Sequence, residues 1–67
     1  MMVHIVSKKW MGGDDRPISE ASVEGVFSSP EKARAFMFKE TGDEDALKYG
    51  LLIKDNYRWS MREVAVR

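Results

Sequence analysis

A helix-start signal in the middle of the chain does most to limit what this sequence can fold into. Residues 28–31 read Ser-Ser-Pro-Glu. A serine hydroxyl there can accept from an unpaired backbone N–H, and Pro30 in the first turn lacks only a donor that would be unpaired anyway. Ala33, Phe36 and Met37 follow at helical spacing, so the sequence predicts a helix that packs this face on another layer.

The end of this helix and the segment after it are less sharply defined. Gly42 is a plausible C′ residue, because glycine adopts the left-handed conformation that often ends a helix. Acidic residues dominate the start of 43–49, and they are favourable near a helix N-terminus. The sequence therefore leaves two alternatives for 43–49: a short second helix ending at Gly50, or a polar connection.

Two strand-like segments precede the helix. Residues 2–7 are rich in Val and Ile, with Val3 and Ile5 on one face and His4 and Val6 on the other, so we expect a strand in the middle of the sheet. Residues 19–28 alternate, which predicts a half-buried strand antiparallel to the first. The residues expected on its buried side are Ala21, Val23, Gly25 and Phe27.

Between these strands, residues 11–18 collect Gly, Asp and Pro, which favour turns and loops. We expect this segment to be the longest and most mobile loop of the chain. Loops on a rigid scaffold commonly carry specificity, so this segment is one place where a partner could be recognised.

A hairpin is predicted after Gly50. Residues 51–54 and 57–61 flank Asp55-Asn56, a pair that tolerates the positive φ of a type I′ turn. This link would place Leu52 opposite Trp59 and Gly50 opposite Met61.

The apolar phase of the last strand switches near Arg62, because Val64 and Val66 are out of phase with Trp59 and Met61. Either a bulge lies there or both faces of the sheet are partly covered, as a dimer would do. The predicted fold is a single α+β domain over 1–67. It has an antiparallel sheet of three to four strands in ββαββ order, with one main helix packed on one face.

The length of the chain limits how much stability its own core can supply. A chain of 67 residues buries only about 60% of its unfolded surface, and chains this small often need a disulfide, a metal or a partner subunit. There is no cysteine, so a homodimer is the expected support.

Eleven basic and eleven acidic residues cancel, which argues against recruitment of nucleic acid or membranes. No apolar run approaches a membrane span and no signal peptide is recognisable, so we expect a cytoplasmic protein.

No catalytic or metal-binding motif stands out. His4 is the sole histidine and lies inside a predicted strand, so we interpret it as structural. The carboxylates at 14–15 and 43–45 do not follow the calcium-loop pattern, and Gly12-Gly13 does not extend into a phosphate-binding fingerprint. We therefore expect no enzyme activity, no cofactor and no metal.

Aromatic and arginine residues suggest binding instead, since Trp, Tyr, Met and Arg are enriched at protein interfaces. The predicted partner-binding residues are Trp10, Asp14, Asp15, Arg58 and Arg62. The leading hypothesis is a non-catalytic protein-binding module that uses one face carrying Trp10, Arg58 and Arg62, together with the acidic loop Asp14-Asp15. The alternatives are a binder of a small anionic, nucleotide-like ligand at a dimer interface, and a binder of single-stranded nucleic acid, which the zero net charge disfavours.

One resemblance supports the fold. The stretch 23–36, with a short strand before it and a final strand ending Arg62-Glu63-Val64-Ala65-Val66, resembles small uncharacterised proteins of phages and prophages over about two thirds of the chain. The resemblance implies an accessory protein that acts in the host cytoplasm by occluding a host or defence protein.

Overall fold

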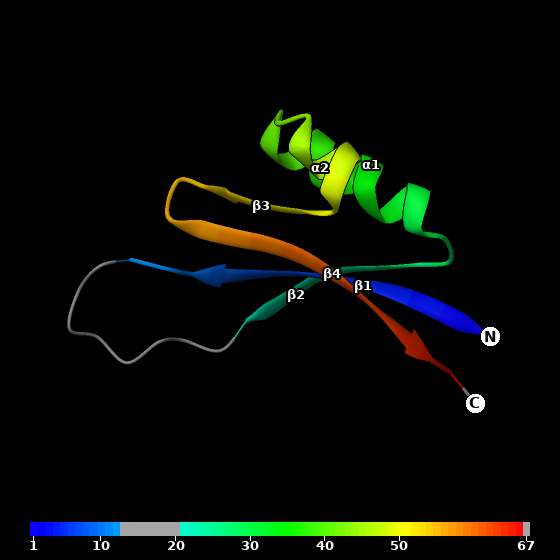
Figure 1. Ribbon diagram of the computed structural model, residues 1–67. Helices are drawn as coiled ribbons and strands as arrows, with labels where there is room; N and C mark the ends of the chain where they lie inside the picture. The colour runs from blue at the N-terminus through cyan, green and yellow to red at the C-terminus, as the bar shows by residue number, and fades with distance from the viewer. Residues whose placement is uncertain (13–20, 67) are drawn as a thin grey trace.

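The structure, a computed structural model that describes residues 1–12 and 21–66, is a four-stranded antiparallel sheet with two helices on one face (Figure 1). The strands lie in the order β2-β1-β4-β3. The predicted α+β class and ββαββ order are confirmed. The elements are β1 (Met2–Trp10), β2 (Ser22–Phe27), α1 (Pro30–Thr41), α2 (Asp45–Tyr49), β3 (Leu51–Lys54) and β4 (Tyr57–Ala65).

Strand β1 lies in the middle of the sheet, as the apolar residues on both of its faces predicted. It pairs antiparallel with β2 on one side and with β4 on the other. It is longer than expected and runs to Trp10 rather than Ser7, because its last residues pair with the start of β4, Trp10 opposite Tyr57. Strand β2 begins at Ser22; positions 19 and 20 of the predicted strand lie outside the described residues, as does most of the predicted loop 11–18.

The predicted signals at both ends of α1 are confirmed. Ser29 is extended at the N-cap, and its hydroxyl accepts from the Lys32 backbone N–H at 3.3 Å, while Pro30 occupies the first turn. Gly42 is left-handed at φ 69°, and its N–H donates to the Phe38 carbonyl at 2.7 Å. These contacts satisfy backbone groups that a helix end leaves without partners.

The segment 43–49, for which the sequence left two alternatives, contains the short helix α2. Its first turn is held by Asp43, whose carboxylate accepts from the Asp45 N–H at 2.9 Å. It ends at Gly50, which is left-handed at φ 62°. A Cβ on Gly50 would lie 2.9 Å from the Met61 sulfur, so only glycine combines this φ with this close approach.

The β3–β4 hairpin has the predicted turn. Asp55 and Asn56 have φ of 52° and 65°, as a type I′ turn requires, and Leu52 pairs with Trp59. The Lys54 ammonium donates to the Thr41 carbonyl at the end of α1, where a positive charge is favourable. The hairpin is thereby tied to the helical layer.

The hydrophobic core lies between the helices and one face of the sheet. The predicted helix face is confirmed, since Ala33 and Met37 are fully buried and Phe36 packs against Phe27 with ring centroids 5.1 Å apart. The buried apolar residues are Val6, Ala33, Met37, Ala46, Leu52 and Trp59. This core therefore covers only one side of the sheet.

One detail of strand phase differs from the predictions, and one alternative that the sequence left open is decided. The β1–β2 register shifts between Val6 and Ser7, so that Glu24 is an extra residue in β2. An extra residue moves the residues before it to the opposite face, which is why Val23 is 60% exposed rather than on the buried side with Phe27. The bulge considered near Arg62 is absent from the β1–β4 pairing, which runs without a shift from Tyr57 to Ala65.

Candidate protein-binding surface

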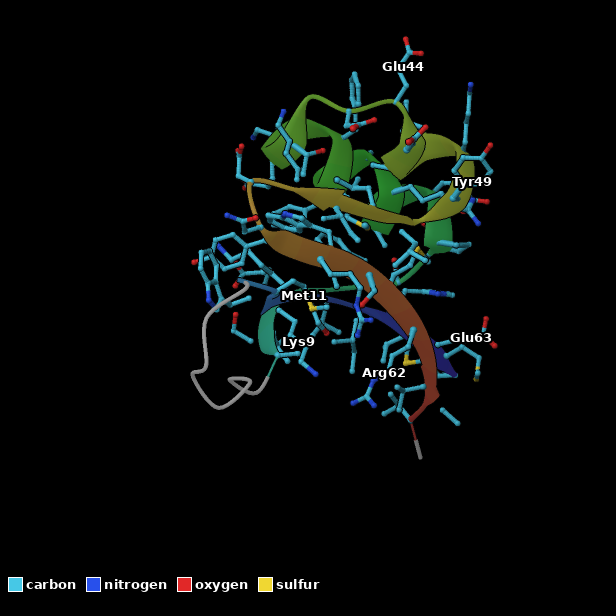
Figure 2. The ribbon with its side chains drawn as sticks, turned by 60° about the vertical axis from the view of Figure 1, so that its left-hand side comes forward. Lys9, Met11, Glu44, Tyr49, Arg62 and Glu63 are labelled. Carbon is cyan, nitrogen blue, oxygen red and sulfur yellow. The ribbon has the colours of Figure 1, made fainter. Side chains whose placement is uncertain are left out.

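The sheet face opposite the helices is the candidate site, and we call it the open face. Because side chains alternate along a strand, every second residue of the paired strands points there. From β1 and β4 these are Val3, Ile5, Ser7, Lys9, Arg58, Ser60, Arg62 and Val64. Figure 2 shows Lys9 and Arg62 on the side of the sheet away from the helices, whereas Glu44 lies at the far end of the helical layer.

The outer strands add exposed apolar side chains to this face. Val26 lies opposite Ile5 and Val23 opposite Ser7, and they are 57% and 60% exposed. On the other side, Leu51 and Ile53 belong to β3 and are 51% and 66% exposed. Exposed apolar residues of this size are ordinary when scattered, but here they share one face of one sheet, which is typical of an interaction surface.

The described charged side chains of the open face are all positive. Lys9 and Arg58 are direct cross-strand partners, and Arg62 lies opposite Ile5. None of the residues named on this face carries a carboxylate. The salt bridge that the structure shows among its described residues, Lys8 to Glu24 at 3.2 Å, lies on the helix-facing side. Among the described residues, the open face therefore combines apolar side chains with three cations and carries no carboxylate.

Trp10 does not share this surface with the two arginines. It pairs with Tyr57, and the two rings meet edge to face with centroids 5.1 Å apart on the helix-facing side of the sheet. The expectation that Trp10, Arg58 and Arg62 lie on one face is wrong. Trp10 shares its face with its partner Tyr57, and strand alternation directs Arg58 and Arg62 of β4 to the other face. The other two predicted partner-binding residues, Asp14 and Asp15, lie outside the described residues.

The remaining aromatic residues also lie away from the open face. The Lys8 ammonium lies 4.7 Å from the Tyr57 ring centroid and 5.4 Å from that of Trp59. Trp59 is only 8% exposed and belongs to the core. A stacking platform for bases needs aromatic rings beside the cations, and here the rings and the arginines are on opposite sides of the sheet.

The single histidine lies within the helix-facing layer. His4 is 6% exposed, between Phe27 and Glu63 in the two neighbouring strands, and its Nδ1 atom has no hydrogen-bond partner among the described residues. Across the same residues, no three His, Asp or Glu side chains come together as a metal ion would need. No helix in the described part of the chain is long and apolar enough to cross a membrane.

Sequence reasoning did not place Val26, Leu51 and Ile53 on the candidate surface. The hairpin register held the necessary signal: if Leu52 and Trp59 point to the core, then Ile53 and Arg58 must share the other face. No family model, curated protein or solved structure matches this chain. The open face must therefore be interpreted from its own chemistry.

Proposed function

We propose that this chain is a non-catalytic protein-binding module and that the open face is its binding surface. The observation that carries the proposal is the combination of exposed Val, Leu and Ile side chains with Lys9, Arg58 and Arg62 on a sheet face that the described helices leave uncovered. Exposed apolar side chains contribute free energy when they are buried, and arginine is among the residues that contribute most to protein interfaces.

Charge complementarity defines the partner. The three cations need carboxylates opposite them, because like charges across an interface cost free energy and opposite charges speed association. A partner that presents Asp or Glu opposite the central strands, with apolar side chains beside them, fits this face. The resemblance to phage proteins leads us to propose that the module inhibits such a host or defence protein in the cytoplasm by covering its surface.

Charge reversal tests the proposal. Host-cell lysate is passed over the immobilised wild-type protein and over an Arg58→Glu, Arg62→Glu double variant. The matched control is a Lys32→Glu, Lys39→Glu variant, which reverses two exposed charges on α1 instead. We expect a protein retained stoichiometrically by the wild type and by the helix variant to be lost from the open-face variant. Titration of that purified protein should give affinities that differ by about 100-fold or more, as expected when hot-spot residues are reversed. Equal affinity for all three forms would refute the proposal.

The same experiment separates the two alternatives. A nucleotide-like ligand bound between two copies would co-elute as a small molecule and raise the thermal stability of the wild type. Single-stranded nucleic acid held by three cations would bind with a log–log salt slope of about −2, since each phosphate contact on a single strand contributes about −0.7. Either result without a retained protein would replace the protein-binding proposal.

A further inference from the structure

Strand β3 presents an unpaired backbone edge. It pairs with β4, and no second strand joins it in the part of the chain that the structure describes. In a hairpin with a two-residue link, the residues flanking the turn form a hydrogen-bonded pair and the pairs alternate from there. Lys54 and Leu52 therefore use their main-chain groups toward β4, while those of Leu51 and Ile53 point outward.

The two edge strands, β2 and β3, differ in how well they could pair with a further strand. The β2 edge is interrupted by the extra residue Glu24, whose carboxylate forms a salt bridge with Lys8. Bulges and charges of this kind discourage a further strand from adding to an edge. Strand β3 pairs without a shift. Leu51 and Ile53, whose main-chain groups point outward, have apolar side chains that are more than half exposed.

Exposed apolar side chains also lie on the helix that precedes this edge strand. Leu47 and Tyr49 of α2 are 46% and 72% exposed, and Tyr49 is separated from Leu51 only by Gly50. Figure 2 shows Tyr49 at the outer margin of the molecule, where α2 turns into β3. A strand that adds to β3 would therefore meet apolar side chains from both layers.

We propose that the strand that adds to β3 is β3 of a second copy, in an antiparallel arrangement that joins two four-stranded sheets into one of eight strands. The outward groups of Leu51 and Ile53 fix the register. Centring the pair on Leu52 places Leu51 opposite Ile53 of the second copy, and each such pair exchanges both main-chain hydrogen bonds. The contact is self-complementary about a two-fold axis, as a dimer of identical chains requires.

Charge favours the edge over the open face as the site of self-association. Two open faces packed together would bring Lys9, Arg58 and Arg62 of one copy against the same cations of the other, which is unfavourable. At the edge the one cation of β3 is Lys54, whose ammonium already donates to the Thr41 carbonyl. Edge pairing would also leave both open faces free, on the same side of the joined sheet.

The test compares single lysine substitutions on the two outer strands. Ile53→Lys puts a charge at the β3 edge, and Val26→Lys is the matched control on β2. Both side chains are well exposed, at 66% and 57%, so both variants should keep the fold, checked by circular dichroism. Sedimentation equilibrium distinguishes the 7.7 kDa monomer from a species of twice that mass.

We expect the wild type and Val26→Lys to dimerise, and Ile53→Lys to dissociate at least about ten times more readily, because charged residues disfavour edge pairing. Hydrogen exchange gives a second measurement: the Leu51 amide should be protected in the wild-type dimer and exposed in Ile53→Lys. A wild type that stays monomeric up to about 1 mM would overturn the proposal. A dimer that Val26→Lys breaks would also overturn it, by placing the contact on the open face, where both side chains lie, and so would a dimer that Ile53→Lys leaves intact.

Discussion

Replacing Met37 by alanine should remove a large part of the stability of this domain. Met37 and Val6 are the largest fully buried side chains among the described residues, and Met37 is where α1 enters the core. The substitution deletes three non-hydrogen atoms, which at about 0.8 kcal/mol each represents about 2.4 kcal/mol of lost burial before any cavity is counted. A cavity term brings the expected loss to about 3 kcal/mol, within the range for buried Met→Ala changes.

That loss is large for a domain of this size. At 0.05–0.15 kcal/mol per residue, 67 residues correspond to a free energy of unfolding of about 3–10 kcal/mol. Because the core covers one side of the sheet only, few other buried side chains can compensate. Met37→Ala should therefore leave the domain marginally folded or unfolded at room temperature.

Urea unfolding followed by tryptophan fluorescence measures the effect, since Trp59 lies in the same core. With an m-value of about 1 kcal/mol per molar, the midpoint should fall by about 3 M. Phe38→Ala is the matched control, because Phe38 is the next residue on α1 and is 37% exposed. Met37→Leu, which conserves volume, should lose less than about 1.5 kcal/mol and remains measurable if the alanine variant does not fold. A Met37→Ala loss no greater than that of Phe38→Ala would refute the one-sided core.

Two further predictions concern local backbone signals. Ser29→Ala removes the hydroxyl that accepts from the Lys32 N–H and should lower the free energy of unfolding in urea by about 1 kcal/mol. Ser29→Asp should keep that stability, because aspartate caps equally well. Equal stability of the alanine and aspartate variants would contradict the cap. Asn56 has φ of 65°, so Asn56→Gly should hold or raise the melting temperature, whereas Asn56→Val should lower stability by about 1–2 kcal/mol, since a β-branched residue is strained there. A valine variant as stable as the glycine variant would refute the left-handed turn.

A one-sided core has a direct consequence for function. The two helices bury the helix-facing side of the sheet, and the described elements leave four apolar side chains of the other side exposed, namely Val23, Val26, Leu51 and Ile53. Burying such a face against a partner releases water from apolar surface, which is the main driving force of association. Under the proposed function, this exposed sheet face serves recognition of another protein rather than binding of a small molecule, which usually needs a concave pocket.

Much of the fold could be predicted because its signals are local. The Ser29 cap, the Gly42 helix end and the Asp55-Asn56 turn each depend on the φ and ψ angles that a few neighbouring residues prefer. The central position of β1 followed from the apolar residues on both of its faces. These features were correct without knowledge of any long-range contact.

The composition of the surface could be predicted only in part, because it depends on register between distant segments. Counting alternate residues placed Val23 inside, and it is exposed because Glu24 bulges out of the pairing with β1. Likewise, Trp10 and Arg58 looked like members of one surface until the β1–β4 pairing put them on opposite sides of the sheet.

The amino-acid sequence by itself determined the two ends of α1 and the β3–β4 turn, since backbone preferences act over a few residues. Only the tertiary structure decided which side chains meet, because a shift of one residue in strand pairing exchanges the two faces of a sheet. That is why Arg58 and Arg62 join an apolar open face, while Trp59, in the same strand, completes the core.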